Sequence, residues 1–453
     1  MGRAFSPLDR ELELLQGEFS PTLVEHMVRL GARITFGPAA KEIFQFTRVD
    51  VSKPTVRRDA EKAGRAYVEV QTAQLEAIER DLPEASQGPD LQQLSVDGAM
   101  VPLVGGEWAE VKTLAIGTVG EPVLVKGEWE VHTGELSYFS RMTDHETFGR
   151  LATVETHRRG TESAGKVCAV NDGADWEQGF VDLHRPDAVR ILDWGHATEH
   201  LSAGAQAVLG AGTAEVSEWL SVQLHELKHG DPEKVLLALR ELRDSLLVHA
   251  GTGSGGEGAE GMNGAAEVFE VVAGREQSFK VVSQSLEYLE KRRDQIRYAE
   301  FIAAGYPIGS GAVESANKLV VEVRMKGAGM HWDRGHVDPM VALRDALCSD
   351  RWEEAWPQIS HRLIQKGMER SARRPEPKGA SETAQEPEGT PCAAAVPIGG
   401  ASAKPARPEV EAAPSLVEPI PAARRPGADH PWRRMPIGRA RYSASPASHS
   451  AET

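Results

Sequence analysis

The sequence predicts a mixed α/β fold, in which a sheet is flanked by helices and interrupted by an all-α insertion. Three consecutive stretches with strand-like alternation and Gly-rich turns lie at 94–101, 107–119 and 134–144. Two shorter apolar runs follow at 166–172 and 188–194, each next to a helical segment. Three antiparallel strands followed by β–α units favour a mixed sheet with helices on its faces.

The first part of the chain, residues 1–90, is mostly helical in pattern and is expected to bind DNA through a helix-turn-helix. A first helix is expected at 38–47, and a second starts near Pro54 with Ser52 as its N-cap. Such a second helix can enter a major groove. An ordinary helical hairpin with a solvated basic face is the alternative. The second helix carries four cations: Arg57, Arg58, Lys62 and Arg65.

The rest of the chain divides by composition and periodicity. Residues 91–196 are expected to form the first part of a catalytic core, and 301–369 its last part. Between them, 197–300 is a helical insertion, in which the low-complexity stretch 251–265 is expected to be a flexible loop. After residue 369 the composition becomes rich in Pro, Ala, Glu and Ser, so 370–453 is expected to be a disordered tail.

Three acidic residues stand in contexts that suit one kind of chemistry. Asp97 in LSVDGAMV and Asp172 in KVCAVNDGADW follow strand-forming residues and precede Gly, so each is expected where a strand ends. Glu314 follows a Gly-Ser-Gly turn and opens a helix. Carboxylates from these positions can converge to hold two Mg²⁺ or Mn²⁺ ions, which activate a water or a 3′-hydroxyl and stabilise the leaving oxygen of a phosphodiester.

Each acid has a rival or a supporting neighbour. Asp175 competes with Asp172 for the second position, and Glu322 competes with Glu314 for the third. Asp193 and His196 follow the last strand, and they are expected to support the site by hydrogen bonding, with a purely structural role as the alternative.

Cations follow Glu314 on the same predicted helix. They suit contact with the phosphates of a bound DNA end, although a solvated basic face is the alternative. The later Trp332 is expected to pack in the core rather than to stack on an unpaired base. The three cations are Lys318, Arg324 and Lys326.

Bulk composition sets further limits. The formal net charge of −16 argues against a protein that coats nucleic acid with its whole surface, but a local basic patch can still bind DNA. The chain contains no run of about 18 apolar residues, so no membrane span is expected. The N-terminus has no apolar segment typical of a secretory signal. The three cysteines are far apart and form no zinc-ligand spacing, so a reducing cytoplasm is expected.

The segment HELKH at 225–229 fits the H-E-x-x-H pattern of zinc proteases. Lys228 stands beside the two histidines, a Gly-Asp-Pro sequence ends the helix at once, and no downstream His or Glu motif presents an obvious third ligand. The surface of a helical insertion is therefore the favoured interpretation, with a zinc metalloprotease as a minor alternative.

With these motifs in place, the chain resembles the DDE transposases of bacterial insertion sequences, most closely the ISKra group. The resemblance runs from roughly residue 20 to 355. Its most specific stretch is 306–352, where the Gly-Ser-Gly turn, Glu314, a basic helix, Met-His-Trp and a Leu-Arg helix come in order. The segments SVDGAMVPL and VNDGADW are similar to the family's first two acid motifs, and ILDWGHATEHL is similar to the segment that follows them.

The resemblance implies an RNase H-like core that cuts DNA at the terminal inverted repeats of an element and joins the ends to target DNA. It implies that Asp97, Asp172 and Glu314 form the catalytic triad. It also implies a homodimer or higher oligomer on DNA, in a bacterial cytoplasm beside the nucleoid. Unlike some relatives, this chain has no Cys-rich zinc segment near its N-terminus and carries a long tail. A non-catalytic helix-turn-helix regulator is the remaining alternative, and it leaves the three acids unexplained.

Overall fold

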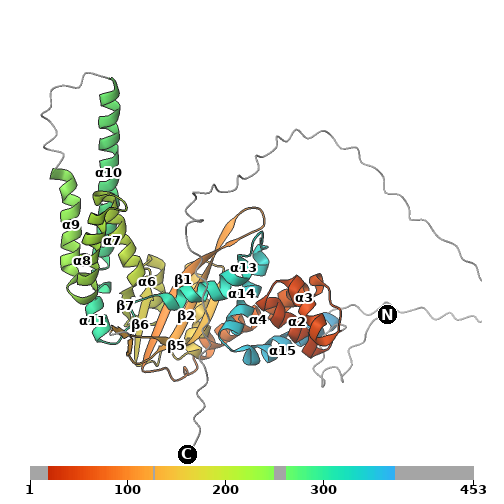
Figure 1. Cartoon of the computed structure of the whole chain (residues 1–453). Coiled ribbons are helices and arrows are strands. Elements are labelled where there is room, and N and C mark those ends of the chain that lie inside the picture. Colours follow the sequence, from red (N-terminus) through yellow and green to blue (C-terminus); the bar gives the residue numbers. More distant parts are fainter. Residues whose placement is uncertain (1–18, 126–127, 249–261, 373–453) are drawn as a thin grey trace, which may run out of the picture. The chain divides into compact units, whose positions relative to one another are not determined.

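A computed structural model describes residues 19–125, 128–248 and 262–372 (Figure 1). The mixed α/β fold expected from the sequence is present, with five strands in the order β5-β2-β1-β6-β7. In this sheet β1, β2 and β5 form an antiparallel meander, and β6 and β7 run parallel to β1. The strands are β1 (Leu91–Pro102), β2 (Trp108–Val119), β5 (Thr133–Arg141), β6 (Lys166–Asn171) and β7 (Val189–Leu192).

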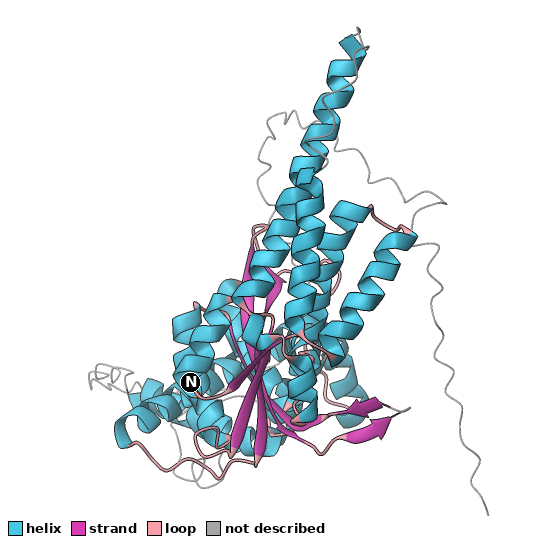
Figure 2. Ribbon diagram, turned by 90° about the vertical axis from the view of Figure 1, so that its left-hand side faces the viewer, coloured by secondary structure: helices cyan, strands magenta, loops and turns pink. Residues whose placement is uncertain are grey.

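A second, two-stranded sheet lies between β2 and β5 in the sequence, and the strand pattern did not predict it. It consists of β3 (Val123–Val125) and β4 (Glu128–Glu130), in which Leu124 pairs with Trp129. Figure 2 shows it at the lower right, apart from the main sheet. Three residues per strand are too few for the period-2 signal to be read.

The two faces of the sheet are covered by different helices because the side chains of β1 alternate. Leu94 and Val96 pack with α5 (His145–Arg158) and α6 (Asp175–His184) on one face. Ala99 and Val101 pack on the opposite face, against helices from the end of the chain and from its beginning. Asp97 belongs to this second set by its odd position. The helices of the second face are α12 (Gly311–Ala316), α14 (Arg334–Cys348), α15 (Trp352–Ala372) and, behind them, α4 (Lys53–Asp81).

A helical block follows β7, as expected. Its helices share one apolar cluster with Val170 and Ile191 of the sheet. The low-complexity stretch lies partly outside the described residues; its last residues, 262–265, are helical, in contrast to the expected loop. No helix in the described ranges has the length and apolar character to span a membrane. The helices are α7 (Trp194–Leu209), α8 (Ala214–His229), α9 (Pro232–Val248), α10 (Met262–Lys291) and α11 (Tyr298–Ala303), with a 3₁₀ turn η1 (Arg293–Gln295) before α11.

The N-terminal region contains α2 (Pro21–Arg33), α3 (Phe36–Thr47) and α4. Ser52 caps α4 as predicted, since its Oγ accepts a hydrogen bond from the Thr55 amide at 3.2 Å. Helix α4 then continues for 29 residues, far beyond a short recognition helix. A Cβ at Gly64 would collide with the Pro339 carbonyl, so glycine lets α4 and α14 pack closely.

The helix that begins at Gly311 is interrupted by a π-helical segment, η2 (Asn317–Glu322), and ends with α13 (Val323–Met325). A buried arginine, Arg344 on α14, donates from Nε to the Val320 carbonyl at 3.0 Å and also to that of Leu319. The same guanidinium donates to the Ala32 carbonyl at 3.1 Å. Arg344 therefore joins the end of α2 to η2.

The disordered tail expected at 370–453 lies outside the described residues beyond position 372. Residues 370–372 are the last residues of α15.

Candidate functional site

Asp97 lies within β1, not at its end, so the prediction that the strand stops there is wrong. It stands opposite Thr113, because β1 pairs with β2 along its whole length to Pro102. The pairing of β1 with β6, in contrast, ends at Leu94. Asp97 therefore lies beyond the last rung shared with the parallel neighbour, where the two strands separate and leave room for a site.

Asp172 directly follows β6, as predicted. Its Oδ1 accepts a hydrogen bond from the Ala174 amide at 3.1 Å. Helix α10 holds this turn from the other side, because the Tyr288 hydroxyl donates to the Asp172 carbonyl and Arg292 Nε donates to the Gly173 carbonyl at 2.9 Å. The helical block therefore determines where the second acid lies.

Asp193 is buried and connects two elements of the site. Its Oδ2 accepts from the His196 amide at 2.8 Å, which caps α7, and its Oδ1 accepts from the Ser310 amide at 2.6 Å. Ser310 Oγ in turn lies 3.1 Å from Glu314 Oε1. Asp193 thus fixes the turn from which Glu314 projects.

These residues line one small pocket, of about 120 Å³. The pocket brings Asp97, Asp172 and Glu314 together from three separate parts of the chain. Glu314 is exposed, whereas the two aspartates are half-buried. The remaining lining residues are Val96, Asp193, His196, Ser310 and Val313.

Glu177 also belongs to this acidic cluster, and the sequence reasoning missed it. Within the described ranges, an oxygen of each of Asp97, Asp172 and Glu177 lies within 4.8 Å of the others, an arrangement that could hold a metal ion. Glu314 is not part of this tighter group. Glu177 is buried in the first turn of α6, and its Oε2 accepts from the Gly173 and Ala174 amides at 2.9 and 3.0 Å.

The electrostatics of the cluster follow from its burial. Burial is the largest of the causes that raise the pKa of Glu177 to about 10. The hydrogen bond between Glu177 and Asp172 also raises this pKa, and so does the negative charge of Asp172. Burial also raises the pKa of Asp97, and the charges of Asp172 and Glu314 contribute, while the Gly98 amide opposes the shift. Crowded carboxylates that disfavour one another's charge are a setting in which a cation binds well.

The competing acids lie elsewhere. Asp175 is paired with Lys291 at 2.7 Å. Glu322 is paired with Lys326 at 2.7 Å, so the predicted DNA contact Lys326 is already neutralised within its own helix. Neither Asp175 nor Glu322 lines the pocket.

The cations expected to bind DNA differ in accessibility. On α4, the side chains of Arg57 and Arg58 are 59% and 69% exposed, and Arg65 is exposed as well. Lys62 is half-buried, and Lys318 on η2 is exposed. Arg57 and Arg58 are exposed but lie within 3.5 and 3.6 Å of Glu61 and Asp59, and Lys318 follows Glu314 by four residues.

Arg324 is a correction, since it is only 2% exposed and cannot contact DNA in this conformation. Its Nε donates to the Gly31 carbonyl at 3.1 Å, and its guanidinium lies over the rings of Phe36 and Trp332. Trp332 is buried, as expected, and its Nε1 donates to the Met325 carbonyl at 3.1 Å.

The HELKH segment forms the end of α8, where the His225 and His229 rings lie 5.0 Å apart. Glu226 is bound by the Asp231 amide and by Lys234 Nζ at 3.0 and 2.8 Å. No third metal-ligating residue joins the two histidines in the described part of the chain. The structure gives this motif no catalytic geometry.

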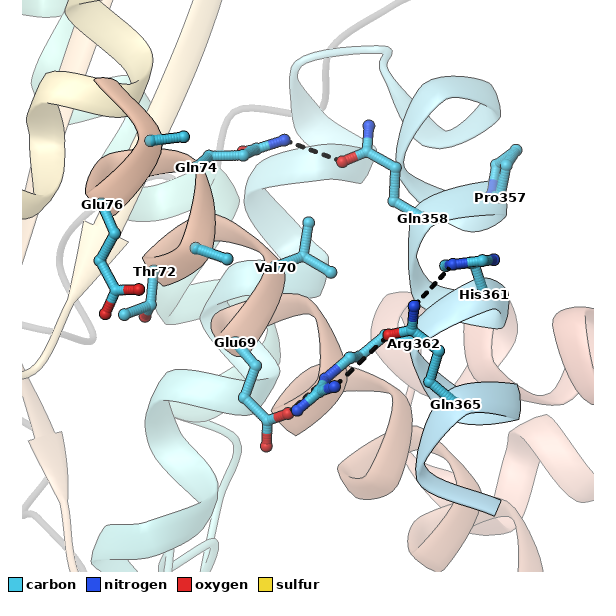
Figure 3. Close-up of a pocket in the computed structure, with 12 residues that line it drawn as sticks. Glu69, Val70, Thr72, Gln74, Glu76, Pro357, Gln358, His361, Arg362 and Gln365 are labelled. Atoms are coloured by element: carbon cyan, nitrogen blue, oxygen red, sulfur yellow. Dashed lines mark hydrogen bonds and ion pairs between the residues drawn. The ribbon is translucent and has the colours of Figure 1, made fainter. Parts of the chain in front are cut away.

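A groove of about 890 Å³ lies between α4 and α15, and it shares no lining residue with the acidic pocket (Figure 3). Polar pairs of the protein itself bridge it. Gln74 donates to Gln358 at 2.8 Å, and Arg362 donates to Glu69 at 2.9 Å. The groove is therefore a seam between two packed helices.

Comparison with known proteins assigns no family: the chain matches no protein-family model, and a search of curated proteins found no match. The acidic pocket is thus the feature from which a function has to be argued.

Proposed function

We propose that the protein is a DDE transposase, which cleaves the ends of a DNA element and transfers them to target DNA. The observation that carries this proposal is the convergence of Asp97, Asp172 and Glu314 on one pocket. These three residues are also the ones on which the resemblance to the ISKra group depends.

The sheet supports an RNase H-like core. In that fold an antiparallel meander is followed by two strands parallel to its first strand, as in the order β5-β2-β1-β6-β7. The first two acids come from β1 and from the end of β6, which are neighbours in this sheet. The third comes from a helix that packs on the same face as Asp97.

The donor set suits a hard divalent cation. The pocket offers carboxylate oxygens and no cysteine, which fits Mg²⁺ or Mn²⁺ better than zinc. Asp97, Asp172 and Glu314 would hold the metal, and Glu177 would hold the Asp172 turn in place. When bound, such a metal lowers the pKa of an attacking water or hydroxyl and neutralises charge on the phosphodiester.

Other residues position the substrate in this proposal. The exposed face of α4, with Arg57, Arg58 and Arg65, would recognise the element's end through phosphate and groove contacts. Lys318 would contact a phosphate near the scissile bond. Because two ends have to be joined in one event, we expect a dimer or higher oligomer on DNA.

The experiment is cleavage of end-labelled DNA taken from the borders of the gene's own locus, with Mg²⁺ or Mn²⁺ and with EDTA. Wild type is compared with Asp97→Asn, which keeps the shape of the side chain. Metal-dependent cuts at the borders that are lost in the variant support the proposal. Binding without cuts indicates a helix-turn-helix protein that only binds DNA, and full cleavage by Asp97→Asn shows that the triad is wrongly assigned.

A further inference from the structure

We propose that Asn317 is a positioning residue for Asp97, which orients the first carboxylate for the metal. This inference rests on the metal site of the proposed function. Asn317 does not line the acidic pocket, so it acts through Asp97 and not on the substrate.

The contact is direct and specific. Asn317 Nδ2 donates to Asp97 Oδ2 at 2.8 Å, and the Gly98 amide donates to Asp97 Oδ1 at 2.6 Å. Both oxygens of the carboxylate are thereby held, which determines the direction of the lone pairs that remain. Outer partners of this kind orient metal ligands in many proteins.

The carbonyl oxygen of the Asn317 side chain argues against a purely structural role. Asn317 is only 6% exposed, and its Oδ1 has no hydrogen-bond partner in the described part of the chain. An unpaired buried carbonyl destabilises the folded chain. A leucine of similar shape would avoid this cost, so stability alone does not account for an asparagine here.

Asn317 reaches the sheet because it lies on the buried face of the helix that begins at Gly311. This face also carries Val313, Ala316, Val320 and Val321, at the i, i+3, i+4, i+7, i+8 spacing of a helix. The backbone is π-helical from Asn317 to Glu322. Arg344 binds the carbonyls of Leu319 and Val320 within this segment. The distortion is therefore stabilised by a dedicated buried cation, and π-helical turns of this kind are frequent at functional sites.

The test compares wild type with Asn317→Leu by titration with Mn²⁺ in a calorimeter, alongside the melting temperature. We expect Mn²⁺ to bind about 10-fold more weakly or worse, because Asp97 loses an orienting partner. The melting temperature should change little, because the variant removes the unpaired carbonyl along with the hydrogen bond to Asp97. A structural residue gives the opposite pair of results, with a lower melting temperature and unchanged Mn²⁺ affinity.

A matched control is Gln92→Leu on the same strand. Gln92 is also a buried amide, but both of its polar atoms have partners. Its Nε2 donates to the Arg159 carbonyl at 2.9 Å, and its Oε1 accepts from Thr161 Oγ1 at 2.8 Å. This variant should melt at a lower temperature and bind Mn²⁺ as wild type does. An equal loss of Mn²⁺ affinity in both variants would overturn the inference, because general loosening of β1 would then explain it.

Failure of the inference and failure of the proposed function give different results. Wild-type Mn²⁺ affinity in Asn317→Leu, together with metal-dependent cleavage of border DNA, overturns the positioning role and leaves the transposase. Weaker Mn²⁺ binding in Asn317→Leu, without any cleavage by wild type, supports the positioning role and overturns the transposase.

Discussion

The side chain of Asn171 replaces the next backbone rung between β6 and β1: its Oδ1 accepts a hydrogen bond from the buried Val96 amide at 2.8 Å. Regular pairing of these strands has already ended at Leu94. The bond holds the strands together one residue before each aspartate, at Val96 before Asp97 and at Asn171 before Asp172. The backbone ladder between β1 and β6 does not continue past this bond, and the two carboxylates face a common space.

Glu314→Gln is expected to reduce DNA cleavage by more than about 100-fold, since losing a ligand should exceed the 10–100-fold cost of losing an outer partner. Glu314 is exposed, so the free energy of unfolding should change by no more than about 0.5 kcal/mol. The measurements are cleavage of border DNA and urea unfolding. Retention of wild-type cleavage would remove Glu314 from the triad.

Substitutions of Glu177 test whether it only accepts hydrogen bonds from the Asp172 turn or also binds the metal. With its pKa raised to about 10, chiefly by burial, it is protonated at neutral pH, so Glu177→Gln should keep both cleavage and stability. Glu177→Ala should lose about 1–3 kcal/mol of stability, because the Gly173 and Ala174 amides lose their acceptor. If Glu177→Gln abolishes Mn²⁺ binding instead, Glu177 is itself a metal ligand.

Arg57→Ala combined with Arg58→Ala should weaken binding to the element's end and lower the slope of log affinity against log salt by about 2, one for each lost phosphate contact. Titrations of labelled border DNA at several salt concentrations measure this slope. Arg80→Ala is a control on the same helix, because Arg80 lies at the opposite end of α4 and its 2.8 Å pair with Asp81 is closer than the 3.5 and 3.6 Å pairs of Arg57 and Arg58. An unchanged slope in the double variant would exclude the basic face of α4 as the recognition surface.

His184 should contribute to acid sensitivity. Its Nε2 lies 2.9 Å from the Gly149 carbonyl and its ring packs on Phe180, and burial lowers its pKa from 6.5 to about 4. The unfolded chain therefore takes up the proton first, so stability from this group is complete above pH 6.5 and is lost as the pH falls toward 4. The loss is at most about 3 kcal/mol.

The measurement for His184 is the free energy of unfolding between pH 7 and pH 4, for wild type and His184→Gln. The variant removes the titrating ring, so its stability should fall less steeply over this range. Carboxylates that titrate in the same range are common to both proteins. Parallel curves would show that the folded protein accepts a proton at His184 without cost.

Much of the sheet could be predicted from the sequence, because its strands carry strong alternation or long apolar runs. Asp172 was placed correctly, since the apolar run before it ends where β6 ends. Asp97 was expected at a strand end because Asp-Gly favours turns, yet β2 pairs with β1 through Gly98 and keeps the strand extended. At this position the pairing of β1 with β2 outweighs the local preference of Asp-Gly for a turn.

Glu177 and Arg324 show why the rest of the site was not predictable. A glutamate in a first helical turn is a recognisable signal when Ser or Thr caps the helix, but Ala174 occupies that position here. Arg324 was expected to contact DNA because it is a cation downstream of Glu314, and its charge did not indicate that it would be buried. It lies on the buried helical face, four and three residues after Val320 and Val321, while the adjacent Val323 is 69% exposed.

The two buried arginines that bind the Gly31 and Ala32 carbonyls have a consequence for engineering. Replacing the N-terminal helices with those of another protein, to redirect the chain to a new DNA sequence, would leave Arg324 and Arg344 without these acceptors. A working chimera would have to transplant residues 19–81 together with compatible partners on α13 and α14. If the proposed function holds, the N-terminal helices and the acidic pocket are coupled through these two arginines and cannot be exchanged independently.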